Sequence, residues 1–353
     1  MKSAGLIAVL FLLTVGAPTC SRFTRAPATM SPATTEPPPR PDVFQMALAL
    51  GRGLNLGNAL EAPREGAWGV TLHEEYFAAI AAAGFNSVRL PVRFSAHASV
   101  QAPYTIAPAC LQRVDWAVDQ ALDKGLVVVL DMHHYEELMA DPEAHRERFV
   151  ALWAQLAEHY AGYPDGLYLE LLNEPCDSLS AQRWNRLLKE AIAAIRRTNP
   201  TRVIVVGPAE WNSPYRLHQL DLPADDRWLI VTFHYYQPFV FTHQGAEWVE
   251  GANAWLGTRW LGSDAERRAI TSDLDAAASW AQRNDRPLFL GEFGAYERAP
   301  IADRARWTAF VAREAEKRGM AWCYWEFCAG FGAYDPERRQ WRADLLAALI
   351  PSP

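Results

Sequence analysis

The chain has 353 residues, with 34 Lys and Arg against 41 Asp and Glu and a formal net charge of −7. Half of the residues are hydrophobic and 21% are charged, which excludes an intrinsically disordered or collagen-like protein. This mild acidity offers no basic surface for a nucleic acid or an anionic membrane, so we expect neither as a partner. The 14 Trp, 12 Tyr and 15 Phe fit either a bulky core or a cleft that grips its ligand with flat apolar faces.

The first twenty residues have the pattern of a secretory signal. Lys2 precedes an apolar run from Ala4 to Ala17, which is too short for a transmembrane helix of roughly 20 residues but suits the core of a signal peptide. Cys20 follows, so a lipid anchor that tethers the protein to a membrane stays open, although the three residues before it fit a lipobox poorly. We therefore expect an exported protein that is secreted, periplasmic or held at the cell surface.

Residues 21–41 predict a stiff linker, and residues 42–353 predict one catalytic domain. Six prolines lie among Ser, Thr and Ala between positions 22 and 41, a composition typical of an extended spacer. No second linker interrupts the rest of the chain.

The five cysteines form no C-x-x-C pair, which argues against a zinc ribbon or a thioredoxin-type site. Cys20 belongs to the predicted signal region. Sequence alone leaves open whether the other four are buried thiols or form a disulfide; they are Cys110, Cys176, Cys323 and Cys328.

Eight short apolar runs, each followed by polar residues and then by a helical pattern, predict strands. They span 53–56, 87–91, 126–131, 167–172, 203–206, 229–233, 287–291 and 321–325. The runs lack strict alternation, as strands buried on both faces do. Between them, apolar residues recur at helical spacing, for example over 184–195. Eight such units predict an α/β fold with a single (β/α)8 barrel, and a doubly wound open sheet is the alternative.

Polar and aromatic side chains gather at the ends of the predicted strands, where the active sites of such barrels lie. A single His or Asn at a strand end is usually structural, but so many at one rim indicate a functional site. They are Asn58, Arg89, His133, His134, Asn173, Glu174, Glu210, Trp211, His234, Tyr236, Glu292 and Trp325.

Two of these residues, Glu174 and Glu292, are carboxylates flanked by apolar strand residues, where a charge is costly unless it is paired or used. Paired carboxyl groups that converge from two strands are the apparatus of glycoside hydrolysis. One must carry a proton and the other must be ionised, and we expect Arg89 to lower the pKa of one glutamate while burial raises that of the other.

A metal site is the competing interpretation, with His133, His134 and His234 as ligands beside the glutamates. The sequence has no H-x-H after the first run and no H-E-x-x-H, and it lacks the glycine-rich loops that bind phosphates. We therefore expect neither a metal nor a cofactor.

Seven segments together resemble glycoside hydrolase family 5, which contains retaining cellulases and mannanases. The resemblance runs from about residue 53 to residue 350, and its motifs are GLNLGNALE, NSVRLPVRF, LDMHHYEELM, LLNEP, HYYQPFVFTHQGAEW, LGEFGAY and WCYWEFCAGFG. Three of the stretches (HHYEELM, THQGAEW and WEFCAGFG) look especially like endoglucanases of Thermotoga type. Some enzymes of that type also accept mannan.

The resemblance implies a role for each matching residue. Glu174 would be the acid/base and Glu292 the nucleophile, and Asn173 would bind the sugar 2-hydroxyl. Around this centre, Arg89 and Tyr236 would hold and ionise Glu292, His133 and His234 would line the subsite of the scissile bond, and Trp325 would be its stacking floor.

Residues farther from the scissile bond match the Thermotoga-type sequences and would contact sugars in outer subsites, with loop packing as the alternative. They are Asn58, Glu61, His134, His243 and Trp248. Glu210 and Trp211 should also approach the cleft, whereas Glu326 should be structural and point away from it.

The sequence thus predicts a monomeric, retaining endo-β-1,4-glucanase that acts on β-1,4-linked glucans and also on mannan or glucomannan. Retention requires the two carboxyl groups to lie about 5–5.5 Å apart, whereas about 8 Å would indicate inversion. A dedicated β-mannanase, a mixed-linkage glucanase and a non-catalytic carbohydrate-binding barrel remain as alternatives.

Overall fold

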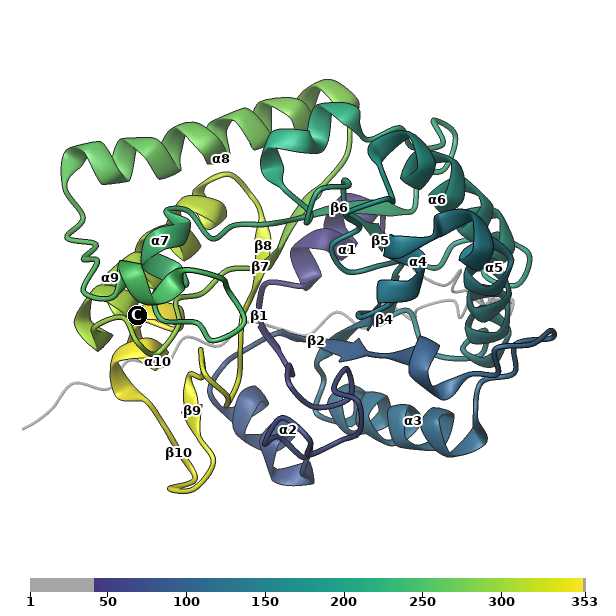
Figure 1. Cartoon of the computed structure of the whole chain (residues 1–353), viewed down its shortest axis with the longest axis horizontal. Coiled ribbons are helices and arrows are strands. Elements are labelled where there is room, and N and C mark those ends of the chain that lie inside the picture. The colour runs from purple at the N-terminus through teal and green to yellow at the C-terminus, as the bar shows by residue number, and fades with distance from the viewer. Residues whose placement is uncertain (1–40, 352–353) are drawn as a thin grey trace, which may run out of the picture. The chain divides into compact units, whose positions relative to one another are not determined.

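The computed structural model describes residues 41–351, and its centre is a closed barrel of eight parallel strands in the order of the sequence (Figure 1). The strands are β1 (Arg52–Asn55), β2 (Ser87–Val92), β3 (Val127–Met132), β4 (Leu167–Glu170), β5 (Ile204–Val206), β6 (Leu229–His234), β7 (Leu288–Glu292) and β8 (Ala321–Tyr324). β1 pairs with both β2 and β8, which closes the barrel. The barrel prediction is therefore confirmed, and the open-sheet alternative is wrong.

Burial explains why these short apolar runs become strands. Almost every strand residue is buried, because one face packs inside the barrel and the other packs against the surrounding helices. Each of the eight predicted runs contains or overlaps its strand.

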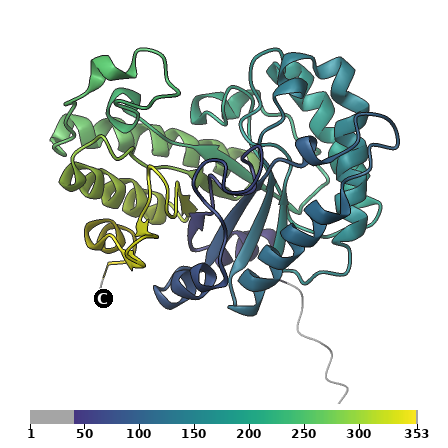
Figure 2. The same ribbon diagram turned by 60° about the horizontal axis from the view of Figure 1, so that its bottom comes forward.

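Helices surround the barrel, and their apolar faces are buried as the spacing predicts. They are α1 (Val43–Ala49), α2 (Glu74–Ala82), α3 (Pro108–Asp123), α4 (Glu136–Ala140), α5 (Pro142–His159), α6 (Ala181–Arg196), α7 (Phe239–Thr242), α8 (Asp264–Asn284), α9 (Ile301–Lys317) and α10 (Ala343–Leu349). Figure 2 shows α5 and α6 (teal) on one side of the barrel and α8 and α9 (green) on the other. Phe149 and Trp153 on α5 and Trp184 on α6 are fully buried.

The fifth strand–helix unit differs from the prediction, because only the 3-10 helix η2 (Pro214–Gln219) lies between β5 and β6. Two more 3-10 helices, η1 (Phe94–His97) and η3 (Ala252–Trp255), and a two-stranded sheet of β9 (Tyr334–Asp335) and β10 (Gln340–Trp341) lie in the connecting segments.

Helix α1 covers the strands with a small apolar cluster of its own. Val43, Met46 and Leu50 pack with residues from six strands, including Val129 and Phe289. The Tyr168 hydroxyl donates a hydrogen bond to the Met46 carbonyl oxygen at 2.9 Å. The segment that follows the predicted linker is thereby part of the barrel's core.

Some expectations fall on residues that the structure does not describe. The predicted signal segment 1–20, including Cys20, and residues 21–40 of the predicted linker lie outside the described residues. The other four cysteines are free thiols, of which Cys110 is half-buried and the rest are buried. Between residues 41 and 351, no helix has the length and apolar character needed to span a membrane.

Gly53 tests how tightly the interior of the barrel is packed. A Cβ atom at this position would lie 2.3 Å from Cys323 Sγ and 2.4 Å from Ser87 Oγ. We predict that Gly53→Ala lowers the free energy of unfolding by about 1–3 kcal/mol through overpacking, measured by urea denaturation. Gly162→Ala is the matched control, because a Cβ there meets no atom within 4 Å. Equal stability of the two variants would contradict the packing described for β1.

Candidate active site

A cavity of about 1250 Å³ lies where the loops after the strands converge. All predicted site residues except one line it: Asn58, Glu61, His133, His134, Asn173, Glu174, Trp211, His234, Tyr236, His243, Trp248, Glu292 and Trp325. The exception is Arg89, which is fully buried beside Glu292. The structure therefore places Arg89 beneath the cavity rather than among the residues that line it, and its expected contact with Glu292 is present.

The Arg89 guanidinium joins the ends of several strands. It forms ion pairs with Glu170 at 2.7 Å, with Glu292 at 2.7 Å and with Asp131 at 3.0 Å. Its nitrogens also donate hydrogen bonds to amide oxygens of Asn55 at 3.0 Å and Asn173 at 2.8 Å. This planar fork can satisfy so many acceptors at once because its five N–H groups point in fixed directions.

Glu292 is the last residue of β7, and its two carboxylate oxygens have different donors. Arg89 Nη1 donates to Oε1 at 2.7 Å, and the Tyr236 hydroxyl donates to Oε2 at 2.8 Å. Only 6% of the side chain is exposed. Two donors hold this carboxylate in one orientation, as a nucleophile requires.

Glu174 follows β4 by four residues and lies in the left-handed backbone region, with a φ of 46°. A non-glycine residue in this region is uncommon, and such strain is concentrated at functional sites. Its Oε1 lies 2.7 Å from Nδ1 of His234, and 28% of its side chain is exposed in the cavity. It is therefore more open to a ligand than Glu292.

The two glutamates are close enough to titrate as a pair. One carboxylate oxygen of each, together with a ring nitrogen of His234, forms a group whose atoms all lie within 4.8 Å of one another. Burial raises the pKa of both carboxyl groups to about 7. Interacting carboxyl groups lose their protons in two coupled steps, so near neutral pH the pair holds one proton.

We expected Arg89 to lower the pKa of Glu292, but the net shift of that pKa is upward, so this prediction is wrong. His234, Arg89 and the Tyr236 hydroxyl lower it, but the loss of hydration on burial outweighs them. Glu292 nevertheless has two donors to stabilise its anionic form, so we assign the shared proton to Glu174.

Four aromatic rings that line the cavity pack against one another, one pair stacked and two pairs edge-on. His133 lies parallel to Trp325, with an angle of 7° and 5.5 Å between ring centroids, and its Nδ1 lies 2.6 Å from Asp131 Oδ2. His134 meets His133 edge-on at 4.7 Å, and Trp68 meets His134 at 5.6 Å. A flat aromatic face with polar edges is the surface that a sugar ring can pack on.

Glu61 differs from its predicted role, because only 1% of it is exposed. Its two carboxylate oxygens accept hydrogen bonds from the backbone N–H groups of Asn58 and Ala59. Burial raises the pKa of Glu61 to about 8. This side chain holds the turn that carries Asn58, and the exposed part of that turn is left for a ligand.

Glu326 is structural, as expected, although the reason differs. It lies beyond the end of β8, and its buried carboxylate accepts backbone N–H bonds from Cys328, Ala329 and Phe331. It shapes the loop rather than pointing to the other face of a strand.

Sequence reasoning missed three polar residues beneath the cavity. Asn55, Asp131 and Glu170 are fully buried inside the barrel and contact Arg89. A signal was present, because a carboxylate near the end of an apolar strand needs a partner as much as Glu174 does. The strand pattern could not say which of these carboxylates face the cavity.

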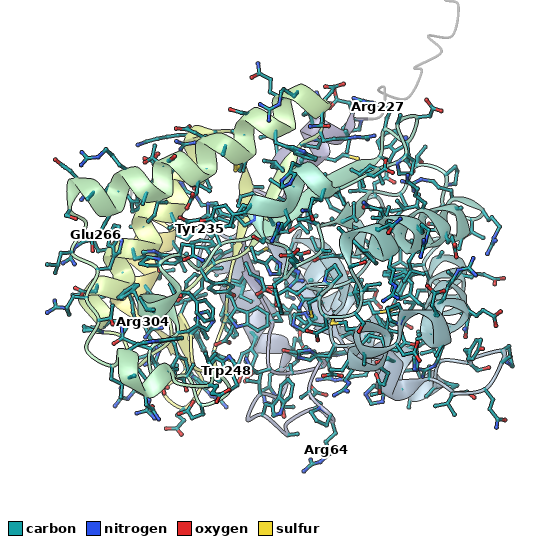
Figure 3. All side chains as sticks on the ribbon, turned by 45° about the horizontal axis from the view of Figure 1, so that its top comes forward. Arg64, Arg227, Tyr235, Trp248, Glu266 and Arg304 are labelled. Carbon is teal, nitrogen blue, oxygen red and sulfur yellow. The ribbon has the colours of Figure 1, made fainter. Side chains whose placement is uncertain are left out.

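The rim of the cavity carries further aromatic residues. Trp211 and Trp248 are 54% and 60% exposed and line the cavity, as predicted for cleft residues. Trp248, labelled in Figure 3, lies between α7 and η3 and packs edge-on against Tyr296 at 4.9 Å. Sequence reasoning missed several lining residues, among them Trp68, Tyr215, Phe239, Tyr296 and Phe331.

The model for the cellulase family, described as glycosyl hydrolase family 5, matches residues 52–330. The chain belongs to glycosyl hydrolase family 5. This confirms the resemblance, and the matched segment contains every residue that lines the cavity except Phe331.

Relatives within family 5 support the same assignment. Endoglucanase H of Acetivibrio thermocellus is 35% identical over 93% of this chain, which spans only 35% of the length of that relative. Thermotoga maritima Cel5A in complex with mannotriose is 49% identical, with a TM-score of 0.86 over 88% of this chain and all of that chain. The same neighbour in complex with cellobiose is 50% identical, with the same TM-score and coverage.

Tyr236 provides a test of how this family 5 site controls Glu292. Its hydroxyl donates to the carboxylate and stabilises the anion, so Tyr236→Phe should raise the pKa of Glu292. The acidic limb of the kcat/KM profile on a soluble β-glucan should then move to higher pH by about one unit. Tyr215→Phe is the control, because its hydroxyl donates to Asp273. An acidic limb that stays in place in Tyr236→Phe would contradict the assignment of that limb to Glu292.

Proposed function

We propose that this family 5 protein is an endo-β-1,4-glucanase that hydrolyses internal bonds of β-1,4-glucans with retention of configuration. The observation that carries the proposal is the approach of Glu174 and Glu292, with oxygens within 4.8 Å of each other. This spacing fits a retaining enzyme, whose carboxyl groups lie about 5–5.5 Å apart, rather than an inverting one. The aromatic rings and the 1250 Å³ cavity suit a sugar chain.

In the first step, an oxygen of Glu292 attacks the anomeric carbon. As the bond from that carbon to the glycosidic oxygen breaks, the carboxyl proton of Glu174 passes to the departing oxygen. The products are a glycosyl ester on Glu292, the shortened chain with its new hydroxyl, and Glu174 as a carboxylate. Burial of Glu174 supports this role, because it raises the pKa of the carboxyl group to about 7.

In the second step, Glu174 acts as a base. Its carboxylate takes a proton from water, the hydroxyl oxygen attacks the anomeric carbon, and the ester bond to Glu292 breaks. Arg89 and Tyr236 are placed to stabilise the departing carboxylate. Both glutamates thereby return to their starting protonation, and two inversions give net retention.

We further propose that the enzyme accepts β-1,4-mannan or glucomannan beside glucan. The observation in favour is the neighbour that binds mannotriose in one structure and cellobiose in another, at 49% and 50% identity. Glucose carries an equatorial 2-hydroxyl, which Asn173 would meet in the plane of the sugar ring. The 2-hydroxyl of mannose is axial and points out of that plane. Acceptance of both sugars thus depends on space beside Asn173, which is only 6% exposed.

We also propose that the protein is exported and acts as a monomer. The signal-like segment 1–20 supports export, either secreted or held at the cell surface through Cys20. A monomer fits a cleft that must stay open to a polymer.

Substrate choice is tested by reducing-sugar release from carboxymethylcellulose, barley β-glucan, glucomannan and mannan. We expect release from the first three, with oligosaccharides of several lengths appearing early, and lower release from mannan. Proton NMR of the first product should show the β-anomer. An α-anomer would contradict the double displacement, and release from mannan alone would favour the dedicated β-mannanase.

Glu292→Ala tests the nucleophile. Loss of the attacking oxygen should lower kcat/KM on an aryl β-cellobioside by roughly 10⁵-fold. Added azide should restore turnover and give an α-glycosyl azide, because the small anion occupies the space of the carboxylate. Glu190→Gln on the outer face of α6, where the side chain pairs with Arg146, is the control and should retain activity. Unchanged sugar release by Glu292→Ala would favour a different catalytic residue, and inactivity of the parent protein would favour a binding barrel.

A further inference from the structure

Three consecutive residues before β6 have left-handed backbones. Glu210, Trp211 and Asn212 have φ values of 62°, 59° and 51°. This conformation is unfavourable for each non-glycine residue, and a run of three is therefore held by its surroundings. Asn212 anchors the turn. It is fully buried, and its backbone carbonyl oxygen accepts a hydrogen bond from the backbone N–H of His234 at 2.9 Å.

The same asparagine also meets the imidazole of His234. Asn212 Nδ2 lies 3.3 Å from His234 Nε2. The other ring nitrogen, Nδ1, lies 2.7 Å from Glu174 Oε1 and 3.5 Å from Glu292 Oε2. One ring thus connects the strained turn to both glutamates.

Counting protons determines the tautomer of this ring. Burial lowers the pKa of His234 to about 4, so the imidazole is neutral and carries one N–H. Glu174, 2.7 Å from Nδ1, carries the shared proton, but the ionised Glu292 lies 3.5 Å from the same nitrogen, and a bare Nδ1 would turn its lone pair toward that charge. The hydrogen therefore belongs on Nδ1, and Nε2 needs a donor.

The amide of Asn212 supplies that donor only in one orientation, with its NH₂ group toward the ring. In this orientation its Oδ1 is buried and has no hydrogen-bond partner. A Cβ on Gly207 would lie 2.2 Å from this Oδ1, so the absence of a side chain at Gly207 makes room for it. The Asn212 side chain thus donates to His234 through its NH₂ group, while its Oδ1 is left without a hydrogen bond.

We propose that Asn212 is a positioning residue that fixes His234 as its Nδ1–H tautomer and thereby directs the acidic proton of Glu174 to Oε2. With Nδ1–H donating to Oε1, the proton of the neutral carboxyl group must be on the other oxygen, which is the one left for the substrate. The glycosidic oxygen then receives the proton directly as its bond to the anomeric carbon breaks. The inference rests on the proposed function for its chemistry, but the tautomer itself is independent of it.

The tautomer can be read directly in the full chain labelled with ¹⁵N-histidine. The sequence has nine histidines, and the signal of His234 is assigned by its loss in His234→Gln. We expect Nδ1 to give a protonated, pyrrole-type resonance and Nε2 a bare, pyridine-type one at neutral pH. A protonated Nε2 in the parent protein would overturn the proposal whether or not the protein is active.

The consequence for chemistry is tested with Asn212→Asp, which keeps the shape but offers Nε2 an acceptor. The imidazole then becomes either an Nε2–H tautomer, which draws the Glu174 proton to Oε1, or a cation, which holds Glu174 ionised. In both forms protonation of the leaving group suffers. The kcat/KM for phenyl β-cellobioside should fall about 10²-fold, whereas that for 2,4-dinitrophenyl β-cellobioside, whose leaving group needs no proton, should change less than about threefold.

Thr232→Val is the matched control, because Thr232 is also buried in this region and its side-chain oxygen makes no hydrogen bond, to the ring or to any other group. It should affect both substrates alike. A parallel loss on both substrates in Asn212→Asp would reduce Asn212 to a structural residue and overturn the proposal. If the parent protein cleaves neither glycoside, the proposed function fails, and the NMR result alone decides the tautomer.

Discussion

The site depends on one buried cation. Arg89 is completely enclosed by the barrel and has ionic or hydrogen-bond partners on β1, β3, β4 and β7, while it lies itself on β2. A buried charge is tolerated only when its partners are held in good geometry, and removal of one partner leaves the others uncompensated. The contacts that hold Glu292 in place therefore also connect five of the eight strands of the barrel.

Charge balance then divides the roles of the glutamates. Four carboxyl groups, those of Asp131, Glu170, Glu174 and Glu292, lie around a single guanidinium, and burial raises the pKa of each. This enclosure cannot hold four anions against one cation, so at least one proton remains in the cluster near neutral pH. It remains on Glu174, which lacks a contact with Arg89 or Tyr236, and this asymmetry distinguishes an acid from a nucleophile.

The sequence was sufficient for the barrel because the strands are buried on both faces and mostly apolar, a pattern that shows as nearly continuous runs. It was also sufficient for the glutamates, since family motifs surround them. It was not sufficient for Glu61, because a carboxylate that binds backbone N–H groups looks the same in sequence as one that binds a sugar. Nor could it find Asn212, whose importance comes from backbone geometry that only the folded turn has.

The histidines of the cleft share one property that bears on how this protein holds its substrate. Burial lowers the pKa of His133, His134, His234 and His243, so all four imidazoles are uncharged at neutral pH. Rings that stay neutral offer a sugar polymer the same donors and acceptors across mildly acidic and neutral conditions. Acidity near neutral pH therefore changes the charge of the two glutamates and leaves the four rings beside them uncharged.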